Sequence, residues 1–260
     1  MTVFRAATFN ANSIRSRLEI VLAWLDKWKP DILCIQETKC QDHDFPREAV
    51  ESAGWHVAFR GEKSYNGVAI ISRRPLEAVR FGLDDGGPAD ETRLICAQAG
   101  GITVVNTYVP QGREIDHAMY AYKLEWLKRL RAYFDRHFKT TEKLIWTGDL
   151  NVARTPLDVY DAASKKDHVC YHEAVRAVFE ECLAWGFTDV FRKFHEGEEK
   201  YSFFDYRAPS SIAQNRGWRI DYILASAPLA KKAKDSLIDM EPRLKPKPSD
   251  HTFLVADFEG

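Results

Sequence analysis

The sequence predicts an α/β protein built from two packed sheets that are covered by helices. The first indication is a β-hairpin, because two apolar runs flank Gly100-Gly101. The second is that stretches with helical spacing alternate with short apolar runs, and hairpins mixed with helices fit two sheets better than a simple βαβ series. The chain has 260 residues, 45% of them hydrophobic, so we expect one core and a single domain over residues 1–260.

The first third of the chain contains three expected strands and one expected helix. Short apolar runs predict strands over residues 3–9, 32–35 and 67–72. Apolar residues recur at helical spacing over residues 17–29, and Pro30 ends that helix.

The rest of the chain continues the same mixture. The expected helices cover residues 117–138 and 172–185, and the expected strands cover residues 94–97, 102–105, 144–146, 220–225 and 253–258. Gly186 is placed to end the second of these helices. The polar stretches 84–91 and 195–200 are typical of surface loops.

Composition and simple motifs exclude several classes of protein. The formal net charge is −1, so a nucleic-acid-binding protein of this kind needs a local basic face. The five cysteines show no CxxC spacing, which favours a reducing compartment and argues against structural zinc.

No HExxH, GxSxG, Walker or GxGxxG pattern occurs, and we expect the histidines at 117, 137, 168 and 172 on the surface. Neither a signal peptide nor an apolar stretch of about 20 residues is present, so we expect a soluble cytoplasmic protein.

Polar residues follow or precede apolar runs at five places. The clearest is Ser249-Asp250-His251, directly before the apolar run 253–256. The others are Asn10 and Asn12, Glu37, Asp149 and Asn151, and Asp221. This pattern predicts one active site that is assembled from the ends of several strands.

The residue types at these positions fit metal-assisted chemistry. Hard divalent cations prefer oxygen ligands, and Glu37 is the best single candidate. Taken alone, a glutamate at the position of Glu37 is more often a solvated loop acid, and Asn10 and Asn12 fit turns at least as well as a metal site. A carboxylate at Asp221, inside an apolar strand, requires a partner. We expect that partner to be His251, with Arg219 or Arg216 as the alternative.

Eight segments carry a family resemblance. They are FNANSIRSR, DILCIQETK, YNGVAIISR, NTYVPQG, WTGDLN, YSFFDYR, RGWRIDYILAS and KPSDH. In this order, from residue 8 to residue 251, they resemble the exonuclease III family of apurinic/apyrimidinic (AP) DNA endonucleases, within the endonuclease/exonuclease/phosphatase superfamily. The resemblance implies a DNase I-like four-layer α/β/β/α sandwich of two mixed sheets flanked by helices.

The resemblance also implies roles for the matching residues. Asn10, Asn12, Glu37 and Asp250 would line the metal side, with Mg²⁺ as the cofactor and Mn²⁺ able to replace it. Asp149, helped by Asn151, would activate the attacking water. Asp221 would orient His251 toward the phosphate, and Tyr108 would hydrogen-bond a phosphate oxygen. The motif leaves open whether Asp149 or the Asp221–His251 pair is the general base; we favour Asp149.

Substrate selection is expected to depend on an apolar pocket and a basic face. Phe203, Trp218 and Ile220 match positions that wall a pocket for a base-free sugar, although Phe203 replaces the tryptophan of other members. The residues expected to contact DNA are Arg15, Arg17, Lys39, Gln111, Arg207, Arg216, Arg219, Lys245 and Lys247.

The implied function is a Mg²⁺-dependent DNA repair phosphodiesterase that cleaves duplex DNA 5′ to abasic sites, with 3′→5′ exonuclease and 3′-end-trimming activity. The implied partner is double-stranded DNA with abasic sites or 3′ ends, bound by a monomer at the nucleoid. Two alternatives remain. One is a non-catalytic nucleic-acid-binding relative on the same fold, and the other is a superfamily phosphatase that acts on another phosphoester, such as an inositol phosphate or sphingomyelin.

Overall fold

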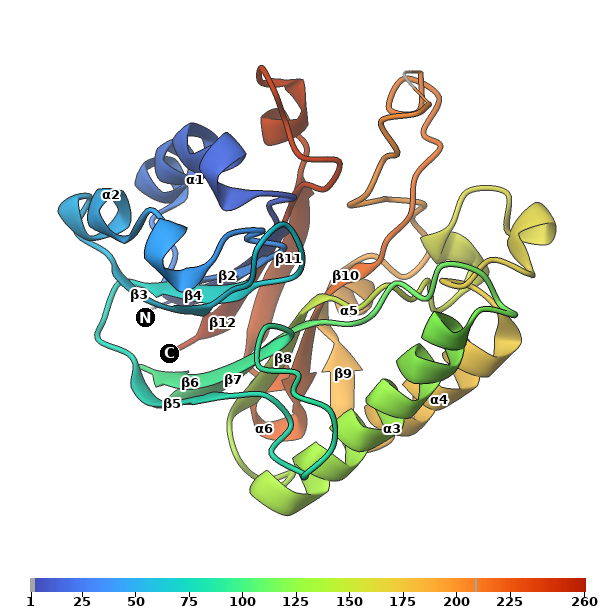
Figure 1. The fold of residues 1–260 in the computed structure, drawn as a ribbon, viewed down its shortest axis with the longest axis horizontal. Helices are drawn as coiled ribbons and strands as arrows, with labels where there is room; N and C mark the ends of the chain where they lie inside the picture. Colours follow the sequence, from blue (N-terminus) through green and yellow to red (C-terminus); the bar gives the residue numbers. More distant parts are fainter. Residues whose placement is uncertain (1–2, 209) are drawn as a thin grey trace.

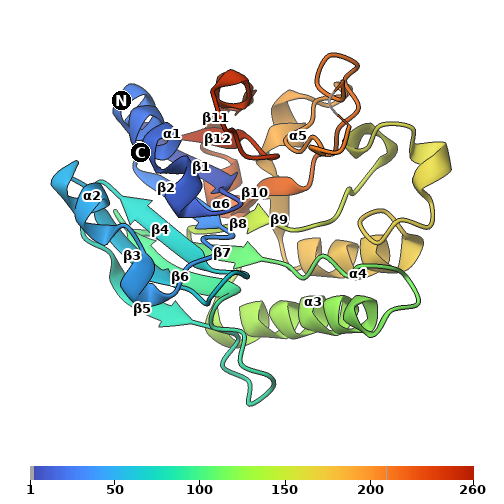
Figure 2. The same cartoon turned by 45° about the horizontal axis from the view of Figure 1, so that its top comes forward.

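Two six-stranded sheets lie face to face, with helices on both outer sides (Figures 1 and 2). This computed structural model describes residues 3–208 and 210–260. The arrangement is the four-layer α/β/β/α sandwich that the family resemblance implied, so that prediction is confirmed.

The first sheet has the strand order β11-β12-β1-β2-β4-β3. Its strands are β1 (Val3–Asn10), β2 (Ile32–Gln36), β3 (His56–Arg60), β4 (Val68–Ser72), β11 (Ala233–Asp239) and β12 (Phe253–Glu259). Only the β1–β2 pair of this sheet is parallel. Helices α1 (Ile14–Trp28) and α2 (Arg47–Ser52) cover its outer face (Figure 2). Trp24 of α1 stacks on Phe253, which stacks on Phe9, so aromatic rings bind this helix to the sheet.

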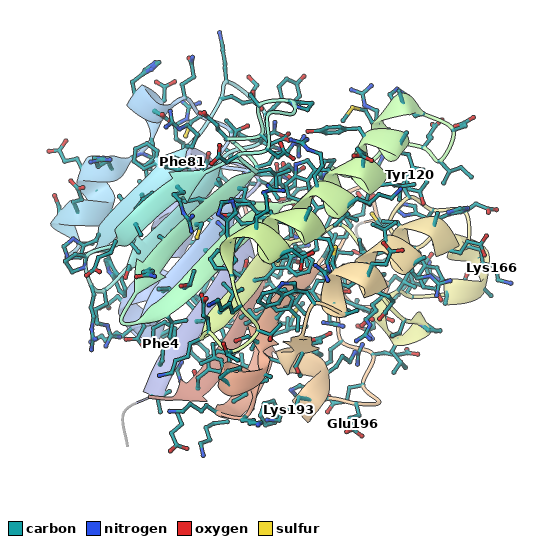
Figure 3. The ribbon with its side chains drawn as sticks, turned by 90° about the horizontal axis from the view of Figure 1, so that it is seen from below. Phe4, Phe81, Tyr120, Lys166, Lys193 and Glu196 are labelled. Carbon is teal, nitrogen blue, oxygen red and sulfur yellow. The ribbon has the colours of Figure 1, made fainter. Side chains whose placement is uncertain are left out.

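The second sheet has the order β5-β6-β7-β8-β10-β9. Its strands are β5 (Glu77–Phe81), β6 (Leu94–Ala99), β7 (Ile102–Tyr108), β8 (Leu144–Asp149), β9 (Phe187–Asp189) and β10 (Asp221–Ser226). The long helix α3 (Ala118–His137) lies beside α4 (Glu173–Leu183) on the outer face, and Figure 3 shows Tyr120 at the amino-terminal end of α3. Two short helices, α5 (Val190–Phe194) and α6 (Ala227–Ala230), complete the fold. No helix in the described ranges is long and apolar enough to span a membrane.

Strand pairing brings the predicted site residues to one edge of the sandwich. The parallel β7–β8 pair places Tyr108 beside Asp149, and the antiparallel β8–β10 pair places Asp221 opposite Asp149. In the first sheet, the parallel β1–β2 pair ends with Asn10 beside Gln36. Two long segments, the orange one before β10 and the red one before β12, rise from this same edge in Figure 1. The edge therefore combines strand ends that supply side chains with loops that can surround a substrate.

The predicted elements are present with small shifts of their ends, and four strands were not predicted. The expected helix 17–29 begins earlier, at Ile14, while α3 and α4 lie within the expected ranges 117–138 and 172–185. The missed strands are β3, β5, β9 and β11. All four are edge strands of the two sheets. Exposed residues interrupt the apolar pattern in β5 and β11, β3 is only partly buried, and β9 has only three residues.

Candidate active site

His251 lies between two buried aspartates. Its Nδ1 is 2.8 Å from Oδ2 of Asp221, and its Nε2 is 3.7 Å from Oδ2 of Asp149. All three side chains are nearly inaccessible to water. Ser202 also donates a hydrogen bond to Oδ2 of Asp221, at 2.6 Å. The expected Asp221–His251 contact is present, and the alternative partners Arg219 and Arg216 do not pair with Asp221.

Asn10 connects this group to Glu37. Its side-chain amide donates to Oε1 of Glu37 at 2.9 Å and to Oδ2 of Asp149 at 2.8 Å, while its oxygen accepts from the main chain of Asn12. The amide of Asn10 is therefore a link between two carboxylates. Its oxygen has a second lone pair beside the main-chain bond, so its place on the metal side of the site stays a prediction.

Oxygen atoms of Glu37, Asn12 and Asp250 form a separate acidic side of the site. The Lys39 ammonium lies 2.6 Å from Oε2 of Glu37 and also donates to Oδ1 of Asn12. The amide nitrogen of Asn12 donates to Oδ1 of Asp250 at 3.0 Å. A cation, the lysine ammonium, thus already lies against this set of oxygens, and the donor types are those that hard divalent ions prefer. The residues fit a metal ion of the kind that the resemblance implied.

The backbone near these side chains is unusual. Asn12, Glu37, Lys39 and Asn151 all have positive φ angles, between 44° and 52°. Residues with side chains adopt this left-handed conformation only when the surrounding structure holds them there, and such residues cluster at functional sites. In each case the conformation occurs at or just after a strand end, where it turns the chain sharply and directs side chains into the site.

Burial and neighbouring charges shift the pKa values of the central groups. Burial raises the pKa of Asp149 to about 7, helped by the charges of Asp221 and Glu37 and opposed by His251. Burial alone would lower the pKa of His251, but Asp221 and Asp149 outweigh it and raise that pKa to about 10. Burial would likewise raise the pKa of Glu37, but Lys39 and Asn10 outweigh it and keep that pKa below its ordinary value. At neutral pH the site therefore combines a protonated imidazole with a carboxyl group that can exchange a proton.

Tyr108 and Asn151 complete the polar wall. Burial and the charges of Glu37 and Asp149 raise the pKa of Tyr108 well above its ordinary value, so its hydroxyl remains a hydrogen-bond donor. Asn151 donates its main-chain N–H to Oδ1 of Asp149 at 3.0 Å and its side-chain amide to the carbonyl of Val109. The orientation of Asp149 therefore depends on Asn10 from one sheet and on Asn151 from the loop that follows β8.

A cavity of about 520 Å³ opens beside these groups. Its lining includes Phe203, Trp218 and Ile220 together with Glu37, Tyr108, Asp149, Asp250 and His251. The ring of His168 lies 4.4 Å from that of Trp218 and adds to the wall. Burial lowers the pKa of His168 to about 4, so this imidazole is neutral. The residue as a whole is exposed, as the sequence predicted. Its ring contact with Trp218 was missed, because a spacing of 50 residues gave no signal that the two rings meet.

Comparison with known proteins is consistent with this geometry. A family model described as the Endonuclease/Exonuclease/phosphatase family matches residues 7–251. The chain belongs to this family. Exodeoxyribonuclease III of Haemophilus influenzae is 31% identical, in a match that covers 97% of this chain and 98% of that protein.

Two solved structures share the fold across almost the whole chain. An AP endonuclease from Archaeoglobus fulgidus matches with a TM-score of 0.97 and 50% identity over 99% of this chain and 100% of that one. A 3′ phosphatase from Neisseria, solved with a product DNA hairpin, matches with a TM-score of 0.93 and 35% identity over the same shares. Within its family the chain therefore belongs to the exonuclease III and AP endonuclease group of nucleases.

Eight of the nine residues expected to contact DNA have accessible side chains in this nuclease. Gln111 and Arg207 line the cavity, and Lys39 lies against Glu37. Arg17 donates to the carbonyls of Asn12 and Pro248 and so joins two loops of the site edge. Arg15, Arg216, Lys245 and Lys247 are exposed.

Arg219 is a correction to the predicted DNA-binding set. Its side chain is fully buried, and its guanidinium pairs with Asp158 and Asp189, each at 2.7 Å. Trp218 and Ile220 on either side of it face the cavity, so alternation along this segment turns Arg219 away from it. A phosphate cannot reach this guanidinium, and its role is structural.

Proposed function

We propose that this nuclease is a Mg²⁺-dependent DNA repair phosphodiesterase that cuts duplex DNA on the 5′ side of an abasic site and also trims 3′ ends. The observation that carries the proposal is that Asp149 and His251, the latter held by Asp221, line the same cavity as the acidic residues Glu37 and Asp250. The apolar side chains of Phe203, Trp218 and Ile220 line another part of this cavity. The names of the relatives, which include an exodeoxyribonuclease III, an AP endonuclease and a 3′ phosphatase, support the same reaction class.

Asp149 is the proposed general base. A pKa of about 7 lets its carboxylate accept a proton from water at neutral pH. His251 is less suited to that role, because its pKa of about 10 keeps the ring protonated. The protonated ring would instead donate to a phosphoryl oxygen, with Asp221 fixing its orientation.

The charge that grows on the phosphate needs further stabilisation. Tyr108 can donate its hydroxyl, and the ammonium of Lys39 is close to the acidic oxygens. Mg²⁺, when bound, would add positive charge beside the phosphate and the leaving 3′-oxygen. Glu37, Asp250 and Asn12 are the residues proposed to hold it, with Asn10 keeping Glu37 and Asp149 at a fixed separation.

The substrate proposal is based on the cavity. Phe203, Trp218 and Ile220 present apolar surface directly beside His251 and Asp149, and the Phe203 ring lies 4.9 Å from that of His251. A base-free sugar fits such a pocket and is easy to extrude from the duplex, whereas a complete nucleotide is larger and costs more to unstack. Because one chain supplies every residue of the proposed site, we further propose that the enzyme acts as a monomer.

An incision assay tests the function directly. A duplex oligonucleotide with one tetrahydrofuran abasic analogue is incubated with the enzyme in Mg²⁺, in Mn²⁺ and in EDTA, beside an undamaged duplex and an inositol phosphate. We expect metal-dependent cleavage 5′ to the analogue and little reaction with either control. Failure to cut with either metal, or faster release of phosphate from the inositol compound, would show that the proposed function is wrong.

A further inference from the structure

Lys123 is a fully buried lysine on α3 whose ammonium contacts three loops of the site. Its Nζ donates to the main-chain carbonyls of Gln111 at 3.1 Å, Asn151 at 2.6 Å and Val169 at 2.8 Å. Burial lowers the pKa of this group. Within the described residues it forms no ion pair with a carboxylate, and its remaining partner is the Cys170 sulfur at 4.0 Å.

This lysine occupies a place where helix packing calls for an apolar residue. The next inward-facing residues of α3 are Trp126, Leu127 and Leu130, all fully buried and apolar. Burying an ammonium group is unfavourable unless hydrogen bonds compensate for the lost water. Packing of α3 against the sheet therefore does not account for a lysine at this position, whereas the three carbonyls do.

Lys123 is bonded to all three loops at once, in addition to direct bonds such as those from Ala153 to the carbonyl of Cys170 and from Asn151 to the carbonyl of Val109. Each loop carries part of the proposed site. Gln111 lines the cavity beyond Tyr108. Asn151 donates its N–H to Asp149. Val169 follows His168, whose ring contacts that of Trp218.

The loop at Gln111 is shaped to lie on the lysine stem. Gly112 has a φ of 103°, and a Cβ added there would lie 3.3 Å from Cδ of Lys123. A residue with a side chain would be strained in this conformation and would crowd the stem. The close approach brings the Gln111 carbonyl to the ammonium.

We propose that Lys123 is a positioning residue that fixes Asn151, and through it Asp149, relative to the Gln111 and His168 walls of the cavity. This inference rests on the proposed function for its effect on the reaction. Loss of the ammonium leaves three carbonyls without their donor, and the loops then keep only the weaker restraint of the bonds between them. A displacement of about 1 Å at a reacting group can reduce a rate by about 100-fold.

The test compares Lys123→Met with the wild type and with Leu130→Ala, a destabilising change about two turns further along the same helix, at a residue with no polar group to bond to the three loops. Hydrogen–deuterium exchange is measured on the metal-free proteins, and incision of the abasic duplex is measured in Mg²⁺. In Lys123→Met we expect faster exchange in segments 110–113, 150–153 and 167–170, a decrease in kcat of at least about 10-fold and a change in KM of less than about 3-fold. In Leu130→Ala we expect a lower Tm with kcat and loop exchange unchanged.

A second variant covers the case in which Lys123→Met does not fold. Lys123→Gln keeps an amide donor on a shorter stem, and we expect values of exchange and kcat between those of the wild type and a full loss. Unchanged exchange in the three segments, or a kcat equal to that of Leu130→Ala at equal Tm, would overturn the positioning role. The exchange readout requires no substrate, so a wild type that fails to incise would contradict the proposed function without deciding the role of Lys123.

Discussion

Nδ1 of His251 lies 2.8 Å from Oδ2 of Asp221, and both side chains are buried. The contact joins His251, two residues before the start of β12, to the first residue of β10, and so spans the two sheets. A buried imidazole between carboxylates keeps its proton to unusually high pH. The pair therefore makes His251 a donor at neutral pH and leaves proton acceptance to Asp149.

The first prediction is a bell-shaped dependence of incision rate on pH. The rate should rise as pH passes about 7, where Asp149 loses its proton, and fall as pH passes about 10, where His251 loses its own. The measurement is kcat/KM for an abasic duplex across this range at constant ionic strength. A rate that falls between pH 6 and pH 8 would contradict the assignment of Asp149 as the base.

Replacing His251 tests the assignment of both limbs of this pH profile. The charge of His251 lowers the pKa of Asp149, so His251→Asn should move the acidic limb of the profile to higher pH and remove the alkaline limb. His56→Asn, at an exposed position on β3, serves as the control and should leave both limbs in place. If the acidic limb does not move in His251→Asn, then that limb does not report the titration of Asp149.

Glu37 should dominate metal affinity. Glu37→Gln removes the carboxylate charge but retains the side-chain shape, and we expect Mn²⁺ and Mg²⁺ to bind at least about 10-fold more weakly. Isothermal titration calorimetry on the DNA-free protein measures this, with the exposed Glu241→Gln as a control. Equal affinity in Glu37→Gln and wild type would place the metal elsewhere.

Trp218 should distinguish the two proposed activities. Its indole lines the cavity beside Phe203 and Ile220, so Trp218→Ala removes a wall that an extruded abasic sugar would contact. We expect incision at the abasic analogue to decrease by about 10-fold or more, and 3′-end trimming to decrease by much less. Leu244→Ala, at an exposed apolar residue that is not part of this cavity, should change neither rate. Equal losses in both reactions would contradict the assignment of Trp218 to a pocket for the abasic sugar.

The buried ion pairs of Arg219 should matter for stability. Arg219→Met would leave Asp158 and Asp189 without one of their buried cations, and we expect the free energy of unfolding to fall by about 3–5 kcal/mol. Arg207→Met breaks an exposed pair with Asp205 and should change it by less than about 1 kcal/mol. Urea denaturation measures both, and equal effects would show that the Arg219 network contributes nothing beyond a surface pair.

The sequence predicted the strands of the two sheet centres and most of the site, for identifiable reasons. Central strands such as β2 and β4 are buried on both faces and appear as uninterrupted apolar runs. Site residues at the strand ends, such as Asp149 and Asp221, follow or precede these runs directly, and the fold then aligns them.

The elements and residues that the sequence did not predict also have identifiable physical causes. Strand β5 is almost wholly exposed, so it lacks an apolar pattern. Arg219 lies in a motif beside two cavity residues, but alternation turns it inward, which charge alone does not reveal. Lys123 and His168 act through contacts with segments far away in the chain, and only the tertiary structure brings these together.

The proposed mechanism depends above all on Asp149 as the general base, and single-turnover kinetics test this role most directly. Wild type and Asp149→Asn are mixed in excess with an abasic duplex in Mg²⁺, and the incision rate and the duplex dissociation constant are measured on the same samples. We predict that Asn, which cannot accept the proton, lowers the incision rate by at least about 1,000-fold while the dissociation constant changes by less than about 3-fold. Incision by Asp149→Asn within about 10-fold of the wild-type rate would contradict the assignment of Asp149 as the general base.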